Sequence, residues 1–235
     1  MQFVIEHLAK SFEQKEVLKD VNFTFETGKI YALLGRNGAG KTTLFNCLNR
    51  DLKANQGQFY LKENDDRREV TASDIGYVLS TPTVPEFLTA REFLKFFIDV
   101  NEKSIVNKKS LDDYFDDVGI NLSDRDLLLK DYSHGMKNKM QMLVNLIAKP
   151  NILLLDEPLT SLDVVAAEEI EQLLRELKQE HIIIFSTHIM DLALNLCDEI
   201  VLLNHGCLQV VEKTELDRQE FREKIVALLR GEEYA

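Results

Sequence analysis

The chain has 235 residues, of which 45% are hydrophobic and 29% charged, and its formal net charge is −12. These proportions are typical of a folded globular protein and exclude a disordered chain, and the length suits one large domain or one domain with an insertion. The negative charge disfavours a nucleic-acid partner, because affinity for a phosphate backbone depends on lysine and arginine. The sequence shows neither the apolar start of a signal peptide nor an apolar run of the roughly 18 residues that span a bilayer. We therefore expect a cytoplasmic protein whose three cysteines are buried thiols in a reducing compartment.

The first third of the chain predicts strands before and after a turn. Val21–Phe25 alternates between apolar and polar residues, as a half-buried strand does, and Ile30–Leu34 is the short apolar run of a buried strand. Apolar residues at helical spacing follow between residues 41 and 48. The charged stretch from Glu63 to Glu69 is most simply a solvated turn.

The middle of the chain predicts helices. Thr89–Val100 and Ser110–Val118 have helical patterns, and no strong strand pattern follows until Ile152. We therefore expect a helical insertion at residues 85–145.

The last third predicts strands that alternate with helices. Buried strands are expected at Ile152–Leu155, His181–Phe185 and Ile200–Leu203, with helices at Val164–Leu177 and Met190–Leu196 between them. A further helix is expected near the end of the sequence, from Glu215 to Arg230. Strands that alternate with helices indicate an α/β fold with a mainly parallel sheet covered on both faces.

A glycine-rich loop directly follows the apolar run Ile30–Leu34. Its sequence is Gly35-Arg36-Asn37-Gly38-Ala39-Gly40-Lys41-Thr42-Thr43, which matches the phosphate-loop pattern Gly-x4-Gly-Lys-Ser/Thr at every fixed position. Glycines allow successive backbone N–H groups to face phosphate oxygens, and the start of the following helix adds its positive end. Lys41 is expected on the β- and γ-phosphates, and the hydroxyl of Thr42 is expected to bind Mg²⁺. The loop predicts binding of a nucleoside triphosphate, most simply ATP.

Two adjacent carboxylates, Asp156 and Glu157, follow the apolar run Ile152–Leu155. Asp156 is expected to face the crevice at the carboxyl ends of the strands, where open α/β sheets bind ligands, and to hold Mg²⁺ directly or through water. Glu157 is the candidate that polarises the attacking water. Such a pair alone is more often a helix cap or a loop pair, but after a complete phosphate loop it predicts catalysis.

The segment from Asp131 to Lys137 lies ahead of this acidic pair, and Ser133 within it is suited to cap a helix. With these motifs, the sequence resembles the nucleotide-binding subunits of ABC transporters over most of its length. In that family the segment carries a Leu-Ser-Gly-Gly-Gln signature, of which Ser133 and Gly135 are kept. The sequence departs from this signature at Tyr132, His134 and Met136. These departures look like variants of export-type members.

The resemblance implies a single ABC-type ATPase domain over residues 1–235, with a P-loop NTPase core and an N-terminal antiparallel β portion. The core would comprise residues 1–84 and 146–214, the helical subdomain residues 85–145, and the C-terminal helix residues 215–235. It also implies that two subunits form a homodimer or heterodimer, in which Ser133 and Gly135 of one subunit contact the γ-phosphate held by the other.

Three further positions take roles only by this resemblance. Phe12 lies where the family stacks an aromatic ring on adenine, although a Phe that only fills the surface or core is the alternative. Ser161-Leu162-Asp163 matches the loop that crosses the dimer interface, and His188 matches the histidine that touches the γ-phosphate and orients the catalytic water.

One position departs from the family pattern. Where the family has a glutamine that contacts Mg²⁺ and the water, this sequence has Ser80, whose short hydroxyl would reach the metal only through a water. The adjoining segment Thr83–Phe97 is rich in apolar residues, and in the family this region receives the membrane subunit. The alternative, that these residues fill the core of the insertion, is equally open. The apolar residues concerned are Val84, Phe87, Leu88, Phe93, Phe96 and Phe97.

We therefore expect an ATP-hydrolysing subunit at the inner face of the cell membrane that powers a transporter with separate membrane-spanning subunits. The expected direction of transport is export. Two rivals remain: a soluble ABC-type ATPase that acts on a non-membrane complex, and a nucleotide switch in which Ser80 makes hydrolysis slow. A P-loop kinase is disfavoured, because Ser133, Gly135 and His188 would have no role in one.

Overall fold

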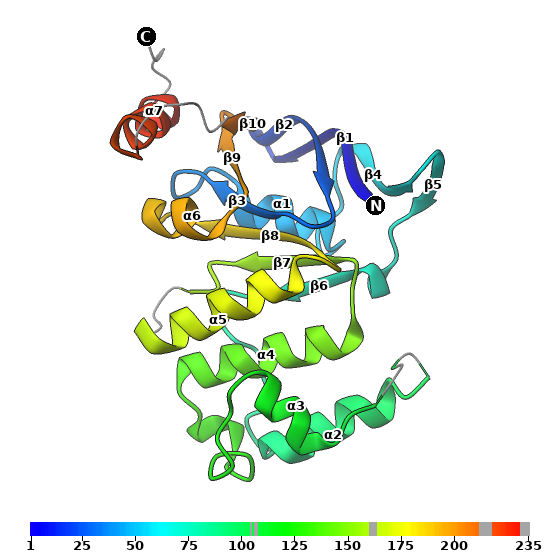
Figure 1. Ribbon diagram of the computed structural model, residues 1–235. Coiled ribbons are helices and arrows are strands. Elements are labelled where there is room, and N and C mark those ends of the chain that lie inside the picture. The colour runs from blue at the N-terminus through cyan, green and yellow to red at the C-terminus, as the bar shows by residue number, and fades with distance from the viewer. Residues whose placement is uncertain (104, 106–107, 160–163, 212–217, 231–235) are drawn as a thin grey trace.

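The computed structural model describes residues 1–103, 105, 108–159, 164–211 and 218–230, which form two sheets and their covering helices (Figure 1). The first sheet is antiparallel and has the order β2-β1-β4-β5. Its strands are β1 (Gln2–Phe12), β2 (Lys15–Glu26), β4 (Gln56–Glu63) and β5 (Asp66–Glu69). This sheet is the N-terminal antiparallel portion expected from the sequence.

The second sheet has the order β10-β9-β3-β8-β7-β6, and all its neighbours are parallel except β9 and β10. Its strands are β3 (Ile30–Leu34), β6 (Ile75–Val78), β7 (Ile152–Asp156), β8 (Ile182–Thr187), β9 (Glu199–Asn204) and β10 (Cys207–Val211). The predicted fold class, an α/β domain with a mainly parallel sheet, is confirmed.

The parallel sheet lies between two apolar cores, which explains why its central strands are apolar at successive positions. On one face, Leu154 of β7 packs with Phe45 of α1 (Lys41–Leu48) and with residues of the antiparallel sheet. On the other face, Leu155 of β7 packs with Ile170 of α5 and Ala193 of α6. The helices on that face are α5 (Val164–Leu177), α6 (Met190–Leu196) and α7 (Arg218–Arg230).

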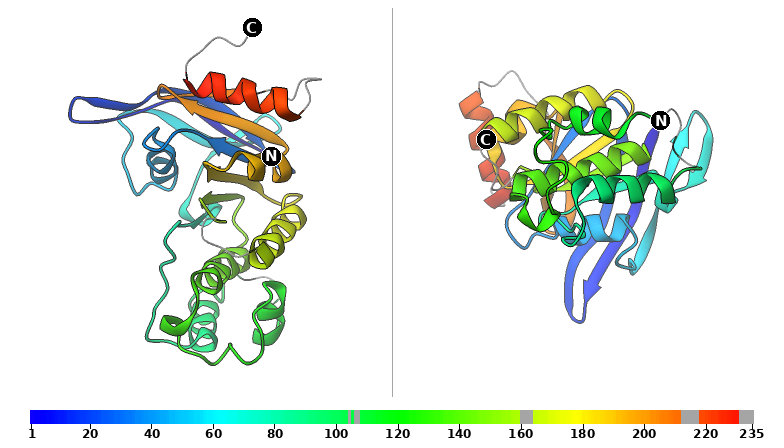
Figure 2. Two further views of the ribbon diagram at one scale, coloured as in Figure 1. Left: turned by 90° about the vertical axis from the view of Figure 1, so that its left-hand side faces the viewer. Right: turned by 90° about the horizontal axis from the view of Figure 1, so that it is seen from below.

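A third core lies within the helical region of the chain, which Figures 1 and 2 show at the end of the molecule away from the antiparallel sheet. It forms between α2 (Ala90–Val100), α3 (Leu111–Asp117) and α4 (His134–Ala148). Each of these helices begins after a side-chain cap, because the hydroxyls of Thr89, Ser110 and Ser133 accept backbone N–H groups of the first turn. Two short 3₁₀ helices cover Ala72–Asp74 and Leu129–Asp131.

The solvated turn predicted from Glu63 to Glu69 is confined to Asn64 and Asp65, and the other residues of this stretch belong to the two strands of a hairpin. Strand β4 ends at Glu63, Asn64 turns the chain with φ of 54°, and β5 pairs with β4. All four residues of β5 are exposed, and β5 lies at the edge of its sheet. A charged edge strand lacks the apolar alternation that identifies a strand from sequence.

The prediction of three buried cysteines is also wrong. Cys47 and Cys197 are buried, whereas Cys207 is exposed at the start of β10, which lies at the edge of the parallel sheet. None of the described helices combines the length and the hydropathy that crossing a bilayer requires.

Candidate functional site

The glycine-rich loop connects β3 to α1 and is shaped by its glycines. Gly38 and Gly40 have φ of 79° and 108°, values that favour glycine over any residue with a side chain. A Cβ atom on Gly40 would also lie 2.7 Å from Cγ1 of Val17 in β2. The loop therefore needs glycine at residue 40 both for its backbone conformation and for its close approach to the antiparallel sheet.

Lys41 is the first residue of α1, and its side chain turns back across the loop. Its ammonium donates a hydrogen bond to the carbonyl oxygen of Gly35 at 2.8 Å, and the residue is only 7% exposed. Burial lowers the pKa of Lys41, while the negative charges of Glu157 and Asp156 act in the opposite direction. Within the described residues the ammonium forms no ion pair, so its charge is available to an anion.

Thr42, Asp156 and Ser186 form a hydrogen-bonded group beside the loop. The Thr42 hydroxyl donates to Oδ2 of Asp156 at 2.8 Å, and the Ser186 hydroxyl donates to Oδ1 at 2.5 Å. Asp156 and Ser186 are register partners on β7 and β8, and Asp156 is 4% exposed. The sequence had not indicated Ser186, although it directly precedes the Thr187-His188 pair at the end of β8.

Glu157 and His188 lie at the carboxyl ends of these two neighbouring strands. Oε2 of Glu157 is 3.0 Å from Nδ1 of His188. The backbone of Glu157 is left-handed, with φ of 50°, and its N–H donates to the carbonyl and hydroxyl oxygens of Ser186 at 3.2 and 3.1 Å. A non-glycine residue held at positive φ by such contacts is typical of functional sites.

An open cavity of about 380 Å³ lies in front of the loop. Glu157 lines it together with the backbone of the loop and with two residues of β2, Lys15 and Val17, which the sequence had not indicated. Phe12 is 44% exposed and is the register partner of Lys15, so it lies at the hairpin next to this cavity. The ammonium of Lys10 is 5.1 Å from the centroid of the Phe12 ring.

A second cavity, of about 390 Å³, lies on the other side of the loop and contains His188. The loop residues Gly35, Arg36 and Asn37 line it, and Ala39 closes the turn by donating its N–H to the carbonyl oxygen of Arg36 at 3.0 Å.

Ser133 and Gly135 lie apart from this group. Ser133 caps α4, where its hydroxyl accepts the N–H of Met136 at 3.2 Å, and Gly135 is in the first turn. Neither residue lines the cavities beside the loop. The structure thus brings together Lys41, Thr42, Thr43, Asp156, Glu157 and His188, and leaves the signature segment elsewhere on the chain.

Two other predicted positions have different outcomes. Ser80 is exposed and follows β6, the strand next to β7. Because Val78 pairs with Leu155, Ser80 lies beyond the strand end at which Asp156 stands. Ser161-Leu162-Asp163 lies outside the described residues.

The oxygen atoms at the strand ends suit a magnesium ion. Mg²⁺ in nucleotide sites is usually held by one or two carboxylates, a hydroxyl and substrate phosphates, rather than by a cage of protein ligands. Thr42 and Asp156 provide that donor set, with their oxygens already 2.8 Å apart.

Comparison with known proteins gives consistent matches. The family model described as ABC transporter matches residues 18–160. YxlF, an uncharacterized ABC transporter ATP-binding protein of Bacillus subtilis, is 34% identical over 208 residues, which are 86% of this chain and 68% of that protein. SrtF, a lantibiotic transport ATP-binding protein of Streptococcus pyogenes, is 29% identical over 226 residues, which are 94% of each chain. A dimeric ATP-binding cassette in a post-hydrolysis state with ADP and phosphate has the same fold, with a TM-score of 0.76 over 91% of this chain and 100% of that one, at 19% identity.

Proposed function

This chain belongs to the ABC transporter family, in which ATP hydrolysis is coupled to transport, and we propose that it is the ATPase subunit of a transporter whose membrane-spanning subunits are separate chains. The observation that carries the proposal is the cluster at the strand ends, where a phosphate loop, an acidic pair and a histidine converge. Thr42 and Asp156 are joined at 2.8 Å, and Glu157 and His188 are 3.0 Å apart.

The residues of the loop hold the triphosphate. The backbone N–H groups from Gly35 to Thr43 surround the phosphates, and the Lys41 ammonium contacts the β- and γ-phosphates. Thr42 and Asp156 would hold Mg²⁺, which would supply neutralisation of the phosphate charge. The exposed ring of Phe12, at the hairpin beside the cavity, stacks on the adenine.

Glu157 and His188 act on the attacking water. The Glu157 carboxylate accepts a hydrogen bond from the water and orients it, and His188 contacts the γ-phosphate and fixes the carboxylate through the contact at 3.0 Å. Phosphoryl transfer needs little covalent participation by the protein, so orientation and charge neutralisation account for most of the rate.

The complete site requires a second subunit. Ser133 and Gly135 begin a helix, and a helix start offers N–H groups to an anion, yet they do not line the cavity of their own chain. Each ATP is therefore bound between the loop of one subunit and the Ser133–Gly135 segment of the other. The dimeric cassette with ADP and phosphate supports this arrangement.

The transporter role places the protein at the inner face of the membrane. Phe87 and Phe96 are 80% and 61% exposed, and Val100, one turn after Phe96 in α2, is also exposed. These side chains contact the membrane-spanning subunit. Val84, Phe93 and Phe97, by contrast, pack against the core of the helical region. Export is the proposed direction, because Tyr132, His134 and Met136 resemble the variants of export-type members.

The decisive variant is Glu157→Gln, which removes the carboxylate charge and keeps the side-chain size. We expect it to retain ATP binding, to abolish steady-state hydrolysis and to accumulate as an ATP-bound dimer in size-exclusion chromatography. An unchanged steady-state ATPase rate would contradict the assignment of Glu157. Co-purification of a membrane protein from detergent-solubilised membranes tests the transporter role against that of an ATPase on a non-membrane complex.

A second candidate function is a nucleotide switch in which ATP closes the dimer and hydrolysis is slow. Ser80 is the observation that favours it, because a serine stands where the family has a longer amide side chain. A single-turnover measurement distinguishes the two functions: cleavage much slower than dimer closure supports the switch, and cleavage that keeps pace with closure supports the transport ATPase.

A further inference from the structure

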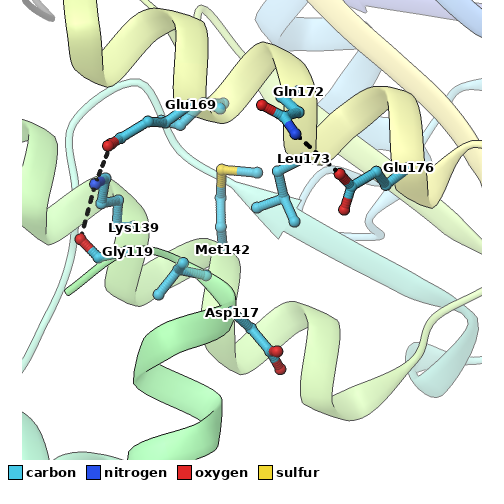
Figure 3. Close-up of a pocket in the computed structure, with 10 residues that line it drawn as sticks. Asp117, Gly119, Lys139, Met142, Glu169, Gln172, Leu173 and Glu176 are labelled. Carbon is cyan, nitrogen blue, oxygen red and sulfur yellow. Dashed lines mark hydrogen bonds and ion pairs between the residues drawn. The ribbon is translucent and has the colours of Figure 1, made fainter.

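Lys139 is a buried lysine of α4 that lies outside the ATP-binding cavity. The residue is 9% exposed, and its ammonium donates to Oε2 of Glu169 at 2.6 Å and to the carbonyl oxygen of Gly119 at 3.2 Å. Figure 3 shows these two contacts on one side of a pocket. Because a buried ammonium is strongly unfavourable unless it is paired, the two acceptors fix the position of this side chain.

The two contacts join three elements of the chain. Lys139 is in α4, the helix that begins with the Ser133–Gly135 segment, whereas Glu169 is in α5. Helix α5 is the first described element after β7 and Glu157. Gly119 follows α3 directly after Val118 and has φ of 62°. The ammonium therefore connects the helix of the signature segment with the helix that follows the catalytic carboxylate.

A surface pocket of about 190 Å³, partly open to solvent, lies next to this ion pair (Figure 3). Met142 of α4 and Leu173 of α5 line it on the apolar side, and Asp117 and Glu176 are among its charged lining residues. Met142 also belongs to the apolar core that includes Ile170 of α5. The Lys139–Glu169 contact therefore adds a polar connection between the two helices at the edge of their apolar packing.

We infer that Lys139 is a positioning residue that couples the two ATP sites of the dimer. The inference rests on the proposed function, in which Ser133 and Gly135 act on the ATP of the opposite subunit while Glu157 acts on the ATP of its own. Because Lys139 ties α4 to α5, a displacement of Glu157 and its strand at one site moves the Ser133–Gly135 segment at the other. Coupling of two sites through a shared element makes ATP hydrolysis cooperative.

The test compares variants of Lys139 with a control variant in α5. Lys139→Met removes the charge and keeps the chain length, whereas Lys139→Arg keeps a cation with donors for both acceptors. The control is Glu171→Gln in the helix that carries Glu169, which removes a carboxylate that binds Arg175 of the same helix at 3.1 Å. We measure ATP affinity, kcat and the Hill coefficient for ATP hydrolysis of each purified full chain.

We expect Lys139→Met to keep ATP affinity within about twofold, because the loop is untouched, and to lower kcat by about fivefold or more with a Hill coefficient near 1. Lys139→Arg and Glu171→Gln keep the cooperative wild-type behaviour. If Lys139→Met does not fold, Glu169→Gln serves in its place, because it removes the partner charge and leaves the bond from Lys139 to Gly119.

Three results overturn the inference: a wild-type Hill coefficient of 1, an unchanged Hill coefficient in Lys139→Met or its replacement, and equal losses in Glu171→Gln. The proposed function fails separately if Glu157→Gln hydrolyses ATP at the wild-type rate. Loss of hydrolysis in Glu157→Gln together with unchanged cooperativity in Lys139→Met rejects the coupling alone.

Discussion

Replacement of Lys41 by methionine is expected to weaken ATP binding strongly and to change the stability of the nucleotide-free protein little. In the proposed complex the ammonium makes two charge-assisted hydrogen bonds, to the β- and γ-phosphates, and each such bond contributes about 1.5–3 kcal/mol. A Coulomb estimate agrees, since unit charges 4 Å apart attract by about 4 kcal/mol at an effective dielectric constant of about 20. Lys41→Met should therefore lose about 3 kcal/mol of binding free energy or more, which weakens ATP binding by a factor of about a hundred or more.

The free protein should respond differently to the same change. Lys41 is buried without an ion pair among the described residues, and its one hydrogen bond goes to the carbonyl oxygen of Gly35. Loss of that bond and relief of the buried charge have opposite signs, so the free energy of unfolding should stay within about 1 kcal/mol of wild type. Urea denaturation without nucleotide measures it, and titration with a fluorescent ATP analogue measures the affinity.

The pH dependence gives an independent check on the buried charge. Burial lowers the pKa of Lys41 below 10.5, so near that pH the unfolded chain binds more protons at this residue than the folded chain. The free energy of unfolding contributed by Lys41 therefore rises as the pH approaches 10.5, and this rise should be absent in Lys41→Met. As a control, Arg36→Gln removes an exposed cation of the same loop and should weaken ATP binding less than tenfold, the weaker effect expected of an exposed charge. Equal losses of affinity in the two variants, or unfolding of free Lys41→Met, would refute the reasoning.

The other predictions concern the loop, a buried carboxylate and the departure at Ser80. Gly40→Ala should lower stability and weaken ATP binding about tenfold, because the new Cβ would lie 2.7 Å from Val17. As a control, Gly28 has φ of 92° and open space around it, so Gly28→Ala should lower the free energy of unfolding only by the backbone strain of about 1–2 kcal/mol. Thermal unfolding and ATP titration measure the two effects. Arg68 holds the pKa of Asp74 well below 3.8, so Asp74→Asn should lose about 2 kcal/mol at pH 7 in urea denaturation. That difference should shrink as the pH falls below 3.8, where stability from a lowered carboxyl pKa is lost. Ser80→Gln should raise kcat about tenfold if the longer amide side chain orients the water, and an unchanged steady-state rate would show that residue 80 does not limit hydrolysis.

The sequence predicted well those helices that bury one face along their length and those strands that bury both faces. Helix α5 spans Val164–Leu177 and α6 spans Met190–Leu196, the predicted ranges, because an apolar stripe at helical spacing packs on the sheet in both. Strand β7 has five consecutive buried residues, which leaves a continuous apolar run in the sequence. Where burial is complete, the pattern and the structure have the same physical cause.

The missed elements lie where burial is partial. Strand β5 is exposed at all four positions and is held by backbone pairing with β4, which leaves no periodic signal. Strand β1 was missed although it pairs on both sides, because its register shifts between Ile5 and Leu8 interrupt the alternation of apolar residues. Among the described strands, β10 pairs with β9 alone, and most of its residues are not buried. Backbone pairing with a neighbouring strand determines β5 and β10, and a pattern of apolar residues does not record such pairing.

For the candidate site, the sequence indicated residues that lie together in one motif, but not residues that reach the site from elsewhere in the chain. The residues of the loop follow one another in sequence, as do the two residues of the acidic pair, and each motif was identified from its residue types. Ser186 was not, because a serine at the end of an apolar strand has no distinguishing spacing, and its importance comes from register pairing with Asp156. Lys15 and Val17 reach the loop only because the first hairpin folds over α1.

The hydrogen bonds of Asp156 indicate which role of the family's glutamine is affected by Ser80 and which is not. In the described structure both Asp156 oxygens accept hydroxyl hydrogen bonds, from Thr42 at 2.8 Å and Ser186 at 2.5 Å. A carboxylate fixed on both oxygens is already oriented before nucleotide binds, so a metal ion would meet a preorganised ligand without help from residue 80. Water, in contrast, would be oriented by Glu157 alone on this side of the site, since Ser80 is exposed and short. On this basis the serine at position 80 should affect cleavage more than metal binding, so Ser80→Gln should change kcat while the Mg²⁺ concentration for half-maximal activity stays the same.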